Sequence, residues 1–324
     1  MLKLLATAAS LVVGAITSIQ PATAQNWPTK PVKFVLPFGP GSGTDISARL
    51  LQEKLAAKWG QSIVIENRPG GDGLVAIGAF VSAADDHVFL YASSASFIAH
   101  PYQHDKLPYD PARDLEPIAR VTDTVLSVSV PTSLNVATLA EFAALAKAQP
   151  GKLNAAGAPG LPEFALRAFM KVRGLDVALV PYRDIVQAGT DLGEGRLQLL
   201  SSSLAIANPH VAAGKARIIA VAGSESTSLA PNVPSTLAAG FPELGVETTV
   251  GLYGPRGMPL ALRERIGADV VAAASDPTIA ARLAPTGQAM RIGGPAELSK
   301  ALVAQATRAA EIAKILGMEK KSGK

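Results

Sequence analysis

The chain has 324 residues, 48% of them hydrophobic, and 30 basic against 26 acidic side chains give it a net charge of +4. This length supports two domains of ordinary size with substantial interiors. Because the charges are scattered rather than gathered in a long basic run, nucleic acid is a poor candidate partner. No cysteine is present, which excludes disulfides and a lipid-anchored N-terminal cysteine, so stability must come from packed cores.

The N-terminal segment predicts a cleaved secretory leader. Lys3 precedes an apolar run over residues 4–16, and small residues follow up to Ala24. This run is shorter than the ~20 residues that a membrane-spanning helix needs. We therefore expect residues 1–24 to be a signal peptide, with cleavage before Gln25 and export of the mature chain.

Strand-like apolar runs alternate with helical patterns in the first third of the chain, which is typical of an α/β sheet with helices on its faces. In the first helical pattern, apolar residues recur at helical spacing and charged residues occupy the other side, so one face packs on the sheet. The expected elements are strands at 32–36, 62–66 and 87–93 and helices at 46–58 and 74–83.

A glycine-rich loop over residues 37–45 joins the first strand to the first helix. Glycines let backbone N–H groups approach a ligand, and the first turn of a helix leaves N–H donors unpaired beside a partial positive charge. The pattern predicts an anion-binding loop. The alternative is a plain turn in which Thr44 or Asp45 caps the helix.

A second α/β unit follows a proline-rich tract at 100–117 and an extended segment at 121–130. Its helix at 163–171 is also preceded by a glycine-rich loop, at 155–162. We expect one domain from 25–126 plus 247–324 and another from 127–246. Further strands are expected at 179–182, 197–200, 218–222 and 246–253, and further helices at 139–148, 260–275 and 296–316.

Patterns for metal and nucleophile chemistry are weak. His100 and His104 have the spacing of one helical turn, but Pro101 and Pro108 argue against a helix, so we expect loop residues and no metal site. Pro40 replaces the first glycine of a nucleophile elbow, and no lysine follows the loop as in a phosphate-binding P-loop.

Dinucleotide binding is the enzymatic alternative. Gly39 and Gly41 lie between strand and helix, and Glu66 ends the next strand where a ribose-binding acid would lie. Thr44 occupies the third glycine position, and an exported protein meets little free nicotinamide cofactor. We therefore expect no enzyme activity and no cofactor, and keep a dinucleotide-binding enzyme as the less favoured alternative.

Several blocks in order along the mature chain resemble the substrate-binding proteins of tripartite tricarboxylate transporters, the Bug family. Both the opening segment and the first glycine-rich loop are similar to the family's. The blocks are residues 27–32, 37–45, 60–70, 107–111 with Asp114, 147–153, 180–183 with 190–192, and 231–235.

The resemblance implies a periplasmic solute-binding protein of the Venus flytrap type, with two α/β domains that close about a hinge on a small organic acid. It also implies delivery to a membrane permease; we expect a monomer, and keep a ligand-loaded periplasmic sensor component as the alternative. Phe38 could equally be a core residue, and Asp45 could only cap its helix. The ligand-binding residues that the resemblance implies are Phe38, Gly41, Ser42, Asp45, Ser93, Ser94, Ser96, Gly157, Ala158, Gly160 and Asp191.

The sequence departs from the family pattern in the second domain. The second loop is short and lacks a Ser/Thr pair, with Glu163 where histidine is common, Arg183 where lysine is common and Asp184 where glycine is common. If Glu163 or Asp184 faces the ligand, it would repel a second ligand carboxylate. We therefore expect a monocarboxylate or amino acid in preference to citrate.

Overall fold

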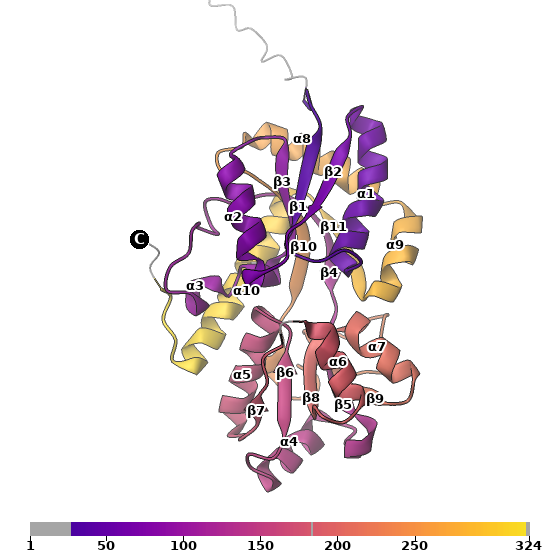
Figure 1. The fold of residues 1–324 in the computed structure, drawn as a ribbon, viewed down its shortest axis with the longest axis vertical. Helices are drawn as coiled ribbons and strands as arrows, with labels where there is room; N and C mark the ends of the chain where they lie inside the picture. The colour runs from indigo at the N-terminus through magenta and orange to yellow at the C-terminus, as the bar shows by residue number, and fades with distance from the viewer. Residues whose placement is uncertain (1–26, 183, 322–324) are drawn as a thin grey trace, which may run out of the picture.

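The computed structural model describes residues 27–182 and 184–321, which form two lobes stacked along the long axis of the molecule (Figure 1). Each lobe is built on one sheet with helices around it, so the predicted α/β class is confirmed. The predicted leader lies outside the described residues. Within those residues, no helix is long and apolar enough to cross a membrane.

The first lobe contains the six-stranded sheet, in the order β11-β4-β10-β3-β1-β2, and takes its strands from both ends of the described chain. Its elements are β1 (Val32–Leu36), α1 (Gly43–Trp59), β2 (Ile63–Asn67), α2 (Leu74–Ala83), β3 (Val88–Ser93), η2 (Ser94–Ser96), α3 (His100–Gln103), β4 (Glu116–Thr124), β10 (Thr248–Gly254), α8 (Leu260–Ala274), α9 (Pro277–Leu283), β11 (Gln288–Gly293) and α10 (Pro295–Leu316).

The second lobe contains the five-stranded sheet, in the order β7-β6-β8-β5-β9. Its elements are β5 (Leu126–Pro131), α4 (Leu139–Ala148), β6 (Asn154–Gly157), α5 (Leu161–Arg173), β7 (Ala178–Leu179), α6 (Ile185–Gly193), β8 (Leu199–Ser203), α7 (Leu204–Ala212) and β9 (Ala216–Val221).

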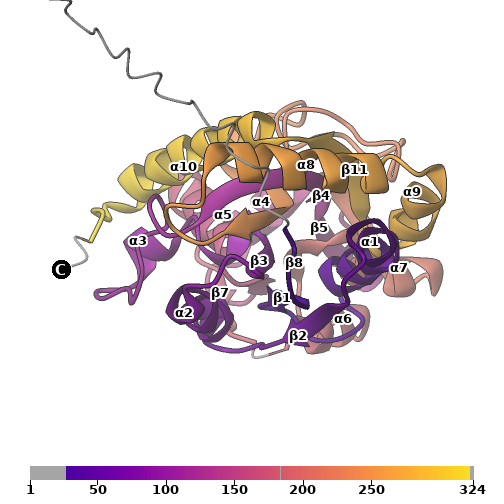
Figure 2. The same cartoon turned by 90° about the horizontal axis from the view of Figure 1, so that it is seen from above.

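Each sheet contains three adjacent parallel strands, and these have the same arrangement in both sheets. In the first lobe β1 lies between β2 and β3, and in the second β6 lies between β7 and β8. From β1 the chain passes through α1 to β2 on one side, and it then returns through α2 to β3 on the other side of β1. Helices α1 and α2 consequently lie on opposite sides of β1 and β3 (Figure 2). Ligands of such sheets bind beyond the carboxyl ends of the strands, at the point where the order reverses.

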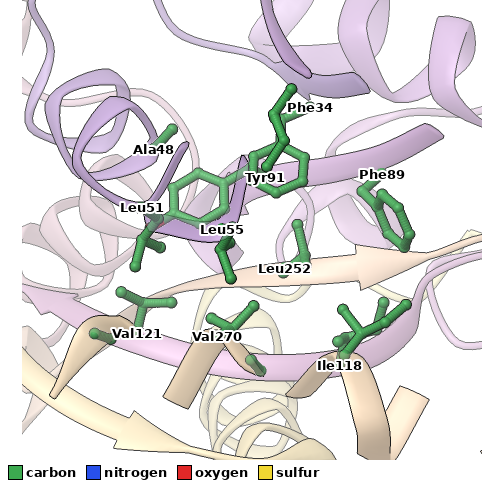
Figure 3. Packing of buried hydrophobic residues seen from close by; sticks show 14 of the residues in the cluster. Phe34, Ala48, Leu51, Leu55, Phe89, Tyr91, Ile118, Val121, Leu252 and Val270 are labelled. Atoms are coloured by element: carbon green, nitrogen blue, oxygen red, sulfur yellow. The ribbon is translucent and has the colours of Figure 1, made fainter. Parts of the chain in front are cut away.

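Helix α1 is fixed to the first sheet by the apolar face that the sequence predicts. Leu51 and Leu55 are fully buried and pack among Tyr91, Val121 and Leu252 (Figure 3). Burying each leucine contributes about 1.5–3 kcal/mol. The first turn of α1 is therefore held in a defined place at the end of β1.

The two lobes share an apolar cluster along one side. Helix α5 of the second lobe packs against α10 of the first, and Leu161 and Phe164 lie in one cluster with Leu298 and Ile312. The rings of Phe164 and Tyr102 stack with centroids 6.1 Å apart. This packing joins the lobes on the α5 side.

The segment expected to be extended over 121–130 is extended, and it is divided into two strands. The chain forms β4 in the first sheet and β5 in the second, with Val125 between them. The Val125 amide donates to the Gly287 carbonyl (2.8 Å), and its carbonyl accepts from the Leu204 amide (3.0 Å). Val125 thus contacts both lobes where the chain passes from one to the other.

The expectation of a loop is wrong at His100. His100 begins the short helix α3, with Pro101 in its first turn and His104 at its C-cap. Proline is tolerated in the first turn because no intrahelical N–H bond is made there. The two histidine rings consequently meet edge to face, with centroids 4.9 Å apart.

Candidate functional site

The segments that follow β3 and β6 contact each other between the lobes, and so do the turn before β11 and the start of α7. A Cβ atom built on Gly160, ahead of α5, would lie 2.2 Å from the Ala95 carbonyl oxygen in η2. One built on Gly287 would lie 3.1 Å from the Ala205 amide in α7. These backbones approach each other closely where the two lobes meet.

The loop before α1 is held by a side-chain network centred on Asp45. Ser42, rather than Thr44 or Asp45, is the N-cap, and its hydroxyl accepts from the Asp45 amide (3.2 Å). The Asp45 carboxylate, only 2% exposed, accepts from the Gly41 amide and the Asn67 side chain (both 2.9 Å). Asp45 therefore acts on the loop by positioning it, as a capping-box acid does.

Arg49 completes this network one helical turn later, with Nε 3.0 Å from an Asp45 carboxylate oxygen. Burial opposes ionisation of Asp45, but hydrogen bonds from Arg49, Gly41 and Asn67 outweigh it and hold its pKa below the usual value. The carboxylate is consequently charged at neutral pH, and its oxygen atoms accept their hydrogen bonds from the protein.

The amides at the start of α1 remain available. Gly43 and Thr44 make no amide hydrogen bond among the described residues, and the amides of Gly160 and Leu161 at the start of α5 also make none. Unpaired N–H groups at the positive end of a helix attract anions. Each lobe thus has a helix start whose first amides have no hydrogen-bond partner among the described residues.

Phe38 and Gly41 lie in the α1 loop at the surface of the first lobe. Phe38 is half-buried and belongs to none of the hydrophobic clusters of the described chain, so its role is not that of a core residue. Its carbonyl accepts from the Asn67 side chain (2.9 Å). Figure 1 shows this loop facing the second lobe above α6.

The serine that ends β3 and the two serines of η2 differ in what their hydroxyls do. Ser93 accepts from the Ala95 amide (3.3 Å). Ser94 is fully buried, donates to Gln305 and accepts from the Thr249 amide, so its side chain faces the lobe interior. The Ser96 hydroxyl has no hydrogen-bond partner among the described residues.

In the second lobe, Gly157 ends β6, and Ala158 and Gly160 lie in the loop between β6 and α5. A Cβ on Gly157 would lie 2.6 Å from the Glu163 Cα, so only glycine permits this approach of strand and helix. The Ala158 amide donates to the Ser201 carbonyl (2.8 Å), and its carbonyl accepts from the Glu163 amide (3.1 Å). This loop is held by backbone alone.

Sequence reasoning missed the serines at the end of β8, because it expected that strand to end at Leu200. Ser201 and Ser203 lie on one side of the strand, since side chains alternate. Neither of these two hydroxyls has a hydrogen-bond partner among the described residues. The signal was present: β8 ends in serines, as β3 does, immediately before a helical segment.

Asp191 does not lie with these loops. It is in the last part of α6, where its carboxylate accepts from Tyr182 (2.7 Å), Gln187 (2.9 Å) and Arg196 (2.5 Å). Hydrogen bonds from Tyr182, Arg196 and Gln187 lower the pKa of Asp191 to about 2. The acid is thus engaged within its own lobe.

The acids invoked against a second ligand carboxylate also have partners. Glu163 pairs with Arg167 one turn along α5 (2.5 Å), which balances its charge. Asp184 is exposed and caps α6 by accepting from the Val186 amide (2.9 Å). Arg183 lies outside the described residues. Glu66, the acid of the dinucleotide alternative, pairs with Lys33 (2.7 Å) and with Arg68.

Comparison with known proteins gives a consistent result. Residues 47–318 match the model of the tripartite tricarboxylate transporter family receptor. The chain is 30% identical over 271 residues to a UPF0065 protein of Bordetella bronchiseptica, and the match covers 83% of this chain and 81% of the relative.

Solved structures agree with this match. Rpa4515 of Rhodopseudomonas palustris with adipate superposes with a TM-score of 0.79 at 28% identity, covering 90% of this chain and 99% of that one. MatC of the same organism with bound malate gives 0.77 at 26%, covering 88% and 99%. Both neighbours carry a dicarboxylate.

Proposed function

The chain belongs to the tripartite tricarboxylate transporter receptor family, and on that premise we propose that it captures a small organic carboxylate between its two lobes. Members of this family are solute-binding receptors and not enzymes, so the dinucleotide-binding alternative is dropped. The observation that carries the proposal is the pair of helix starts with unpaired amides, one on each lobe, at the reversal points of the sheets.

The ligand carboxylate would be held by neutral donors. The four segments at the cleft, residues 37–42, 93–96, 157–160 and 201–203, contain no lysine or arginine. Backbone amides and the uncommitted hydroxyls of Ser96, Ser201 and Ser203 supply the donors. Water between these groups and the ligand is nearly as favourable as direct contact.

We propose residues 25–126 plus 247–324 as one domain and 127–246 as the other, moving about the segments near Val125. The loaded protein delivers its ligand to the membrane permease of a tripartite transporter, as a monomer in the periplasm after loss of the leader. The malate and adipate of its neighbours favour a dicarboxylate, and the pairing of Glu163 with Arg167 removes one argument against a second carboxylate.

A thermal unfolding panel of mono-, di- and tricarboxylates, amino acids and NAD tests the proposal. A ligand at 100 times its dissociation constant stabilises the native state by about 2.7 kcal/mol, which raises the Tm by several degrees. We expect a response confined to carboxylates. Silence from every acid would contradict capture of a carboxylate, and stronger stabilisation by citrate than by any dicarboxylate would contradict the preference for a dicarboxylate.

Gly160→Ala tests closure between the lobes. Its φ of +82° and the 2.2 Å approach of a Cβ to Ala95 leave no room for a side chain in the contacting state. We expect loss of ligand-induced stabilisation. Gly174→Ala is the matched control, since Gly174 also has a positive φ but nothing within 4 Å of its Cβ. Equal responses from both variants would show that closure at Gly160 is not needed.

A further inference from the structure

Two clusters of histidine and acidic side chains lie away from the cleft in the described part of the chain. One comprises Asp72, His100 and His104, and the other Asp85, Asp86 and His87. In each cluster one oxygen or nitrogen atom per residue lies within 4.8 Å of the others. They differ in whether their nitrogen atoms are free to bind a cation.

In the His87 cluster both ring nitrogens are committed. Nε2 accepts from the Thr29 amide (3.0 Å), which fixes the proton on Nδ1, and Nδ1 donates to Asp86 (2.6 Å). No lone pair remains for a metal. This cluster is therefore a hydrogen-bonded support for the start of β3.

In the His100 cluster the geometry suits a metal. His100 is fully buried, with Nδ1 2.7 Å from the Tyr109 hydroxyl and Nε2 3.4 Å from an Asp72 carboxylate oxygen. Two ligands of a tetrahedral zinc ion at about 2.1 Å lie about 3.4 Å apart. Metal-bound histidines donate their other nitrogen to such an oxygen partner, as Nδ1 can to Tyr109.

Without a metal, the opposite tautomer of His100 satisfies both nitrogens, with Tyr109 donating to Nδ1 and Nε2 donating to the Asp72 carbonyl (3.0 Å). A change of tautomer cannot give His104 the hydrogen bond that it lacks. Its Nε2 is buried and has no hydrogen-bond partner among the described residues, although the ring packs against His100. Neither ring nitrogen of His104 has a hydrogen-bond partner among the described residues, so the one that faces Asp72 and His100 can bind a cation.

We propose that Asp72, His100 and His104 form a binding site for a divalent transition metal, with zinc the best fit. Two imidazoles and one carboxylate are a ligand set that zinc favours, and water would complete a tetrahedron. Asp72 belongs to the loop ahead of α2, and the histidines to α3. The ion would therefore clamp two segments of the first lobe that follow β2 and β3, the strands on either side of β1.

The test uses the untagged mature protein stripped of metal with EDTA, with zinc affinity measured by competition with a chromophoric chelator. We expect one zinc per chain, with affinity at least tenfold weaker in His104→Gln and in Asp72→Asn. Asparagine accepts the φ of +55° at position 72, so that variant keeps the backbone. Asp86→Asn, in the second cluster, is the matched control and should bind zinc as the wild type does.

Cobalt provides a second measurement on the wild-type protein that does not depend on any variant folding. We expect the visible absorption of tetrahedral cobalt with nitrogen ligands, displaced by one equivalent of zinc. Octahedral cobalt spectra, or equal zinc affinity in the wild type, His104→Gln and Asp72→Asn, would overturn the proposal.

Discussion

The two lobes build the same three-strand frame at the cleft but hold the loops of that frame by different means. In the first lobe a buried carboxylate, Asp45, collects hydrogen bonds from the loop, from β2 and from its own helix. In the second lobe the loop is held by backbone bonds and by the contact between Gly157 and Glu163. The first-lobe loop thus depends on the charge of Asp45, and the second-lobe loop depends on the small volume of Gly157.

Adding a methyl group should damage only the loop that depends on volume. In Gly157→Ala the new Cβ would lie 2.6 Å from Glu163 Cα, so backbone must move, and we expect about 3 kcal/mol of destabilisation in urea unfolding. Gly39→Ala, in the first lobe, has nothing within 4 Å and should change stability by less than about 0.5 kcal/mol. Equal losses would erase the distinction between the lobes.

Removing a charge should damage the loop that depends on charge. Asp45→Asn keeps the shape of the side chain but weakens the hydrogen bonds that it accepts from Arg49 and Gly41. It also brings the new NH2 group against the NH2 group of Asn67. We therefore expect about 2 kcal/mol of destabilisation. Glu53→Gln, on an exposed position of the same helix, is the control and should be nearly neutral. A neutral Asp45→Asn would show that the network does not hold the loop.

The same network predicts a pH dependence. Because the pKa of Asp45 is lower in the folded state than in the unfolded chain, its contribution is present above the unfolded pKa, near 4. The contribution is lost as pH falls through the folded pKa. The stability difference between the wild type and Asp45→Asn should therefore shrink as urea unfolding is repeated from pH 7 towards pH 3. A constant difference would exclude ionised Asp45 as its source.

The smallest effect is expected at the acid of the second lobe that lies outside the cleft loops. Tyr182→Phe removes the hydrogen bond that lowers the pKa of Asp191 most, so this pKa should rise from about 2 in an NMR titration. Stability should fall by only about 0.5–1 kcal/mol. Ligand affinity should not change, and a large loss of affinity would place Asp191 in the site after all.

The local pattern of apolar and polar residues was enough to predict the main strands and helices of the two lobes. Strand 32–36 and helices 74–83 and 139–148 have the predicted bounds, because apolar periodicity and flanking glycine or proline mark them. Helices α6, α7 and α9 were missed, as was the edge strand β11. Two of these, α7 and α9, carry an internal or initial proline, and their packing depends on contacts distant in the sequence.

The glycine-rich loops of the site were predictable for the same reason, whereas side-chain roles within them were not. Asp45 bonds to Asn67, 22 residues away, and Ser94 bonds to Gln305, 211 residues away. Such partners decide whether a polar group faces the ligand or the protein. The serines of β8 were missed because the expected strand was placed too early, and position in a strand decides which side chains reach its carboxyl end.

The most direct test of capture between two lobes is a calorimetric titration of the best carboxylate into the wild type, Ser96→Ala and Ser203→Ala. One hydroxyl lies on each lobe, and neither has a partner within the described protein, so both variants should keep their unliganded Tm. We expect each variant to bind the carboxylate about tenfold more weakly than the wild type, because each loses roughly one hydrogen bond. Wild-type affinity in both variants would contradict a ligand held by both lobes at these strand ends.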